Sequence, residues 1–80
     1  MPDYIHDLKK NTGRTMELRF TDGYVVRARL ISVDPDSAPN DLVYDVVEVM
    51  SWGPLDPAKV DLKSAHSASA AQLASWRVVP

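Results

Sequence analysis

The stretch from residue 14 to residue 33 restricts the fold of this chain more than any other part of it. Between Thr15 and Phe20, apolar and polar side chains alternate, which is typical of a strand that is buried on one face. Asp22-Gly23 follows, a pair that readily adopts the positive φ angles of a tight hairpin turn. Residues 24–33 alternate in the same way, so we predict a β-hairpin over this stretch.

The second strand of this hairpin carries apolar residues on both faces. One face holds Tyr24, Val26, Ala28 and Leu30. The other holds two arginines in its middle and, toward its ends, Val25, Ile31 and Val33. A long strand with apolar ends on both faces fits a strongly bent strand shared by two halves of a barrel. We therefore predict an all-β fold, a small open barrel of about five strands.

The third strand is predicted at residues 42–50, which are rich in valine and tyrosine. Asp45 and Glu48 are three residues apart, so a bulge near residues 46–47 is needed if both are to face water. We expect these acids to pair across the sheet with two residues of the preceding strand, Arg27 and Arg29.

The flanking segments complete the order of elements. Residues 2–10 have apolar side chains at helical spacing and predict a short N-terminal helix. Residues 34–41 hold two prolines among polar turn formers and predict a loop. The fourth strand has no clear place within residues 53–70, where a Ser/Ala-rich segment fits a poor strand, a helix start or a flexible stretch. A helical turn at 71–74 and a last strand at 75–79 follow.

Nine residues make up the predicted core: Leu8, Met16, Leu18, Phe20, Val26, Ala28, Leu30, Val46 and Val49. The 80 residues predict one small domain, residues 1–80, and the absence of cysteine leaves it without disulfides or thiolate metal sites. Two histidines and no recognisable set of nucleophile, base and acid predict neither a metal, nor a cofactor, nor an enzyme. A small core that neither a disulfide nor a metal ion stabilises favours homo-oligomerisation.

Charge and hydropathy restrict the partners and the compartment. The first third of the chain is basic and the middle is acidic, which suits head-to-tail association, a local basic patch or simply solvated faces. The net charge of -2 argues against strong non-specific binding of nucleic acid. No apolar run approaches the ~20 residues of a membrane span, and no signal-peptide pattern is present, so we expect a cytoplasmic protein.

Several short motifs together carry a family resemblance: Leu8 in the helix, Gly13 before the first strand, Met16 and Leu18 within it, Asp22-Gly23 at the turn, and Asp34 after the long strand. With this order of elements, the chain resembles the Sm-like (LSm) family of small SH3-like barrels. The likeness covers residues 4–50 by motif and the remainder by element order. It implies a ring in which the fourth strand of one subunit pairs with the fifth of the next. It also implies RNA binding through the loops after strand two and before strand five.

The chain departs from the family pattern in both of these loops. The family's first loop has Asp, two residues, an apolar residue and Asn, whereas here a proline-containing insertion follows Asp34 and leaves Asn40 as a shifted equivalent. The family's second loop carries Arg or Lys followed by Gly, and residues 64–74 contain no such pair.

Five residues are candidates for RNA binding. Asp34 and Asn40 would hydrogen-bond an unstacked base, and Trp52 would stack on one. Arg27 and Arg29 would contact phosphates. Each has an alternative: the Asx side chains cap their own turns, Trp52 plugs a barrel end or a subunit contact, and the arginines form a solvated or salt-bridged face.

Trp76, Val78 and Ile31 are the candidates for an oligomer interface. One small barrel has no obvious place for Trp76 and Ile31, and Trp76 and Val78 lie in a last strand whose edge has little protection. The expected function is that of an Sm-like homo-oligomer, a ring by resemblance, that binds single-stranded RNA. The alternative is a protein-interaction or structural small-barrel module without nucleic acid. No membrane or small-molecule substrate is expected as a partner.

Overall fold

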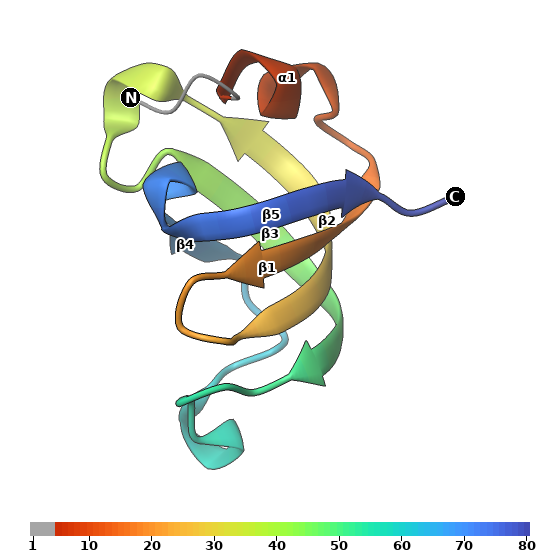
Figure 1. Cartoon of the computed structure of the whole chain (residues 1–80), viewed down its shortest axis with the longest axis vertical. Helices are drawn as coiled ribbons and strands as arrows, with labels where there is room; N and C mark the ends of the chain where they lie inside the picture. Colours follow the sequence, from red (N-terminus) through yellow and green to blue (C-terminus); the bar gives the residue numbers. More distant parts are fainter. Residues whose placement is uncertain (1–4) are drawn as a thin grey trace.

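A computed structural model describes residues 5–80, which form one antiparallel sheet of five strands with a short helix at one end (Figure 1). The all-β class expected from the sequence is confirmed. The strand order is β4-β3-β2-β1-β5, so β4 and β5 are the edge strands of a sheet that is not closed into a barrel. The elements are α1 (Ile5–Lys10), β1 (Thr15–Phe20), β2 (Val25–Val33), η1 (Pro35–Ser37), β3 (Leu42–Ser51), η2 (Pro57–Lys59), β4 (His66–Ala68), η3 (Ala70–Gln72) and β5 (Leu73–Val78), where η denotes a 3-10 turn.

The hairpin of β1 and β2 confirms the prediction from alternation. Its first strand has the expected bounds, and its second begins one residue later than expected. In the turn, Gly23 has a φ of 96°, and its N–H donates to the carbonyl of Phe20 over 3.1 Å. The N–H of Phe20 donates to the carbonyl of Tyr24 over 2.9 Å and closes a three-residue loop.

The pairing of β2 with β3 contains the predicted bulge. Ala28 lies opposite Val46 whereas Arg27 lies opposite Glu48, so Val47 is the extra residue. As expected, both acids of β3 therefore face the arginines of β2.

A second irregularity in this pairing overturns one expectation. Because the register also shifts between Leu30 and Ser32, Val33 turns inward and is 5% exposed, whereas Ile31 keeps the outward position that alternation gives it and is 38% exposed. Strict alternation of β2 had placed Ile31 and Val33 on the same face, whereas the structure places them on opposite faces.

The core lies on the inner face of the curved sheet. The buried apolar residues are Ile5, Leu8, Met16, Leu18, Phe20, Tyr24, Val26, Ala28, Leu30, Val33, Leu42, Tyr44, Ala70 and Leu73. Seven of the nine predicted core residues are among them, but Val46 and Val49 are only partly buried and pack at the margin. Their exposure follows from the shortness of β4, which pairs only with residues 42–44 at the start of β3.

The helix closes one end of this core. Ile5 and Leu8 are buried, and the turn after the helix is fixed by Gly13, whose N–H donates to the carbonyl of Leu30 over 2.6 Å. The described part of the predicted helix is confirmed, and residues 2–4 of that prediction lie outside the described residues.

The last third of the chain contains the strand that the sequence did not locate. β4 occupies residues 66–68 within the Ser/Ala-rich segment. The predicted helical turn at residues 71–74 is η3, at residues 70–72. The final strand therefore begins at Leu73, two residues earlier than expected.

The chain after β3 returns to the β1–β2 turn and packs tightly on it at Gly53. This residue has a φ of 55°, and a Cβ built there would lie 2.7 Å from the backbone nitrogen of Tyr24 and 2.8 Å from the carbonyl carbon of Gly23. Both glycines therefore adopt a backbone conformation that L side chains rarely take, but only Gly53 is also blocked by backbone atoms.

We expect Gly53→Ala to lower the free energy of unfolding by more than about 2 kcal/mol, because it adds a backbone collision to the cost of the positive φ. Gly23→Ala is the matched control, since its Cβ would meet only the Cα of Gly53 at 3.8 Å, and it should cost about 1 kcal/mol. Urea denaturation at one protein concentration measures both. Equal losses for the two variants would contradict the close approach at Gly53.

Candidate functional site

A pocket of about 410 Å³ opens between the β1–β2 turn, strand β4 and the loop of residues 52–65. Its aromatic side chains come from three different strands: Phe20 ends β1, Tyr44 lies on β3 and His66 begins β4. Tyr24, directly before β2, adds a fourth ring. The curvature of the sheet brings these separate positions together.

The rings of the pocket pack against one another. Phe20 stacks on Tyr24 with ring centroids 5.6 Å apart and contacts Tyr44 at 6.3 Å. On the other side, His66 stacks on Tyr44 at 5.8 Å. Aromatic pairs at such distances stabilise a structure beyond their buried area, so the floor of the pocket is a rigid part of the core.

Two tyrosines bring polar atoms into this otherwise apolar floor. Tyr24 and Tyr44 are 5% and 4% exposed, and neither hydroxyl has a hydrogen-bond partner within residues 5–80. Burial raises the pKa of Tyr44 to about 12, and the neighbouring Tyr24 and Asp22 act in the same direction. Burial, followed by the charge of Asp22, also raises the pKa of Tyr24. Both phenols are therefore uncharged at neutral pH.

The loop wall of the pocket is organised by Asp61. Its carboxylate accepts hydrogen bonds from the N–H of Lys63 over 2.9 Å and from the hydroxyl of Ser64 over 2.7 Å. The Ser64 hydrogen bond is the main reason that the pKa of Asp61 lies below its ordinary value. The carbonyl of Asp61 also bonds Nε2 of His66, and because a carbonyl only accepts, Nε2 carries the proton.

At the opposite end of β3, a buried carboxylate joins the loops before β3 and before β5. Asp41 is 3% exposed, and its Oδ1 accepts from the N–H of Ala70 over 2.7 Å. Its carbonyl accepts from the N–H of Asp34 over 2.9 Å. The sequence analysis did not single out Asp41, since one acid in an acidic loop carries no signal of burial.

Of three predicted RNA-binding residues, Asp34 and Asn40 lie in the loop before β3, whereas Trp52 lies apart from them, after β3. Asp34 caps η1, where its carboxylate accepts from the N–H of Asp36 over 3.0 Å and from the hydroxyl of Ser37 over 2.7 Å. The Ser37 hydrogen bond is the main cause of the lowered pKa of Asp34, which thus has the turn-capping contacts of its alternative role. Asn40 is exposed in the same loop. Trp52 follows the other end of β3, half-buried, with its ring 6.5 Å from that of Tyr24.

The other two, Arg27 and Arg29, lie on the outer face of β2. Arg29 is exposed and pairs in register with Asp45. Arg27 is half-buried, with its Nη1 3.9 Å from a carboxylate oxygen of Glu48. Its Nε is the buried side-chain polar atom that lacks a hydrogen-bond partner among the described residues.

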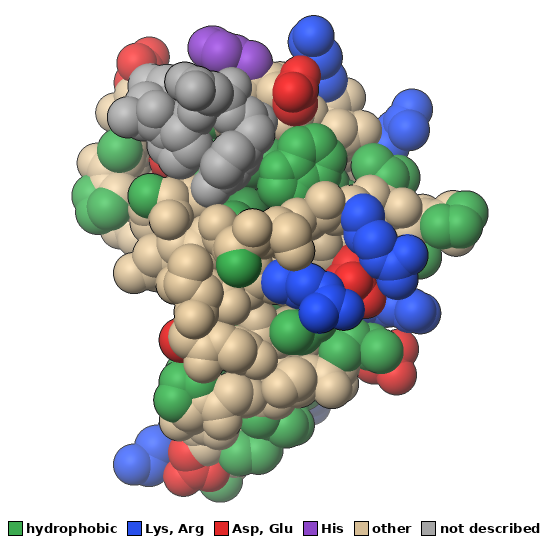
Figure 2. Space-filling model, viewed as in Figure 1, with side chains coloured by type: hydrophobic (Ala, Val, Ile, Leu, Met, Phe, Trp, Pro, Cys, Tyr) green, Lys and Arg blue, Asp and Glu red, His purple; other side chains and the backbone are tan. Residues whose placement is uncertain are grey.

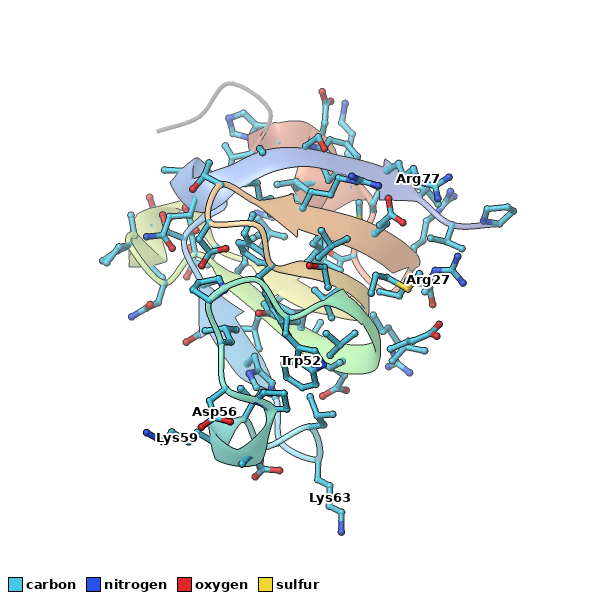
Figure 3. All side chains as sticks on the ribbon, turned by 60° about the horizontal axis from the view of Figure 1, so that its bottom comes forward. Arg27, Trp52, Asp56, Lys59, Lys63 and Arg77 are labelled. Atoms are coloured by element: carbon cyan, nitrogen blue, oxygen red, sulfur yellow. The ribbon has the colours of Figure 1, made fainter. Side chains whose placement is uncertain are left out.

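Arg27 belongs to a row of alternating charges that crosses four strands, Arg77, Glu17, Arg27 and Glu48, which we call the charged row. Its centre is Glu17, only 5% exposed. Glu17 accepts from Nε and Nη2 of Arg77 over 3.0 and 3.3 Å, and from Nε of Arg19 over 3.2 Å. Basic side chains surround an acidic one on this face (Figure 2), and Arg27 and Arg77 extend from the same side of the molecule (Figure 3).

The predicted interface residues fall on two kinds of strand. Trp76 and Val78 lie on the edge strand β5, with Trp76 half-buried against the core and Val78 37% exposed. Ile31 is also exposed, but it lies on β2, which is paired on both sides. Only the first two can therefore be covered by a strand that adds to an edge.

Comparison with known proteins identifies no relative, since no family model, curated protein or solved structure matches this chain. Within residues 5–80, no helix is long and apolar enough to cross a membrane. In the same part of the chain, no three acidic or histidine side chains gather in a way that could hold a metal ion.

The charged row predicts a specific dependence of stability on pH. Hydrogen bonds from Arg77 lower the pKa of Glu17 from its ordinary value of 4.5 to about 2. The unfolded chain therefore takes up this proton first, and the stability due to ionised Glu17 is lost as the pH falls from 4.5 to about 2.

We expect Glu17→Gln to lower the free energy of unfolding at neutral pH and to remove this part of the acid dependence. The difference in the free energy of unfolding between the wild-type protein and the variant should thus become smaller as the pH falls from 4.5 to about 2. Urea denaturation over a pH series measures this gap. Glu48→Gln, at the exposed end of the row, is the control and should keep the wild-type acid dependence. A gap for Glu17→Gln that stays constant with pH would contradict the prediction.

Proposed function

We propose that this chain is an Sm-like small β-barrel module that assembles with copies of itself and binds single-stranded RNA. The observation that carries the proposal is the identity of the two edge strands. Among residues 5–80 the sheet ends in β4 and β5, the strands through which the resemblance implies that subunits pair. A pairing of unlike edges is head-to-tail, and it closes into a ring when the rotation between subunits allows.

The physical need for such pairing is greatest at β5. An edge strand leaves unpaired N–H and C=O groups that attract other strands unless charges or prolines protect it. In β5 the protection is limited to Arg77, whose guanidinium already binds Glu17, and to Pro80 beyond the strand. Val78 and the half-buried Trp76 add apolar surface that a neighbouring strand would cover.

The RNA part of the proposal rests on the two loops that Asp41 joins. Its hydrogen bond to Ala70 places the loop of residues 34–41 next to the turn before β5. These are the two loops that the resemblance assigns to RNA. Asn40 is exposed there, and its amide has both the donor and the acceptor needed to bind a base edge.

A second candidate function, a protein-interaction module without nucleic acid, is favoured by the state of two predicted RNA contacts. Asp34 is engaged with its own turn, and Arg27 lies in the charged row beside Glu48. RNA binding would have to break or share these contacts, whereas assembly through strand edges would leave them in place.

We expect the wild-type chain to form a discrete oligomer at micromolar concentration and Val78→Asp to dissociate it, because a charge would enter the apolar contact of β5. Ile31→Asp is the matched control: Ile31 is 38% exposed but lies on β2, which is paired on both sides, and its change should leave the oligomer intact. Light scattering gives the mass of each. A wild-type mass equal to that of one chain would refute the assembly.

We expect the oligomer to bind a short U-rich RNA and Asn40→Ala to weaken this binding about tenfold without changing the mass. Asp36→Ala, an exposed change in the same loop, is the control and should not weaken it. Fluorescence anisotropy of labelled RNA measures the affinity. If the wild-type oligomer forms but does not bind the RNA, the result contradicts the RNA-binding function and supports the protein-interaction function.

A further inference from the structure

The aromatic pocket contains polar atoms that no residue of the described chain uses. Tyr24 and Tyr44 line it, each more than nine-tenths buried, and neither hydroxyl has a hydrogen-bond partner within residues 5–80. Asp22 uses one carboxylate oxygen, Oδ1, to accept from the N–H of Tyr24 over 3.0 Å, so Oδ2 is available. Asp22 is exposed, and Nε of Arg27 is the fully buried side-chain polar atom without a partner among the described residues, so both hydroxyls and Oδ2 remain accessible. A ligand in the pocket can supply hydrogen-bond partners to all three.

The charge around the pocket selects a cation. Two carboxylates, Asp22 and Asp61, line it. Lys59 also lines it, but its side chain extends away from the body of the molecule, so its ammonium group faces solvent (Figure 3). The charge of Asp22 already disfavours ionisation of both phenols, which would place further negative charge there. An anionic ligand such as a phosphate would meet the same repulsion.

The burial of the rings determines the kind of cation. Phe20, Tyr24 and Tyr44 are at most 8% exposed, and each packs on another ring, so these three rings offer little open face to a quaternary ammonium ion. Phenol and carboxylate oxygens instead accept hydrogen bonds from N–H groups. The side chains of Leu55 and Val60 supply an apolar wall for an aliphatic stem.

We propose that the pocket binds a primary alkylammonium group, carried either by a small free amine or by a lysine side chain. The N–H donors would reach Oδ2 of Asp22 and the hydroxyls of Tyr24 and Tyr44, and the alkyl stem would lie along the loop wall. Its volume of about 410 Å³ is at the small end of the range for ligand pockets and suits such a group. This site does not depend on assembly or on RNA.

The test is a titration of the wild-type chain with n-butylamine at neutral pH, followed by amide chemical shifts in two-dimensional NMR. We expect saturable shifts confined to the residues around the pocket. Butyltrimethylammonium, which has no N–H donor, and butyrate, which has the opposite charge, should bind about tenfold more weakly or not at all. Equal binding of either compound would overturn the proposal.

Variants assign the contacts. Asp22→Asn keeps the oxygen that accepts from Tyr24 but removes the charge, and it should weaken butylamine binding about tenfold. Tyr44→Phe removes one hydroxyl and keeps the ring, and it should weaken binding several-fold. Asp36→Asn, the same change of charge on the η1 loop, is the control and should have no effect. Unchanged affinity in Asp22→Asn would overturn the proposal even if Tyr44→Phe fails to fold.

A last arm distinguishes the two sources of the ammonium group. Nα-acetyl-lysine methylamide carries the same group on a peptide unit, and putrescine carries it on a free diamine. Tighter binding of the lysine derivative assigns the pocket to a polypeptide partner, and tighter binding of the diamine assigns it to a free amine. Failure of both, together with failure of butylamine, would refute the site and leave the proposed assembly untouched.

Discussion

The bulged pairing of β2 with β3 is the constraint on which the rest of the structure depends. A single sheet without a second layer can cover its apolar face only by curving over it. The extra residue Val47 and the shift around Ile31 interrupt a strictly flat register and keep the apolar side chains on the inside of the curve. Because of this curvature, Phe20 and Tyr44, from strands that are not neighbours, are 6.3 Å apart, and the helix needs to close only one end.

Local patterns predicted the parts of the fold that depend on neighbours in the sequence. The hairpin around Gly23 follows from alternation and turn chemistry, and the bulge at Val47 follows from the spacing of two acids that both face water. β4 could not be predicted, because its three residues are small and its pairing with residues 42–44 is a long-range contact. Val33 was placed on the wrong face because a register shift in the pairing of two strands leaves no mark on the sequence of one.

The same distinction holds for the candidate site. Asp34 caps its own turn, and its place before a proline and a serine explains why. The sequence had predicted this role as the alternative to RNA binding. The pocket was not foreseen, since its rings come from separate strands and each resembles an ordinary core residue. Asp41 was also missed, since its hydrogen bond to Ala70 spans 29 positions of the chain. Sites of this kind exist only once the sheet has curved.

The loop that walls the pocket holds its own shape. Asp56 accepts from the N–H of Ala58, Asp61 accepts from Lys63, and both contacts close within the loop rather than on the sheet. Loops that are bonded mainly within themselves belong to the less stable parts of a structure and open more readily than its core strands. Amide protons in this loop should consequently exchange with solvent while those of β1 and β2 remain protected. This wall of the pocket can thus open and close while the sheet beneath it stays folded.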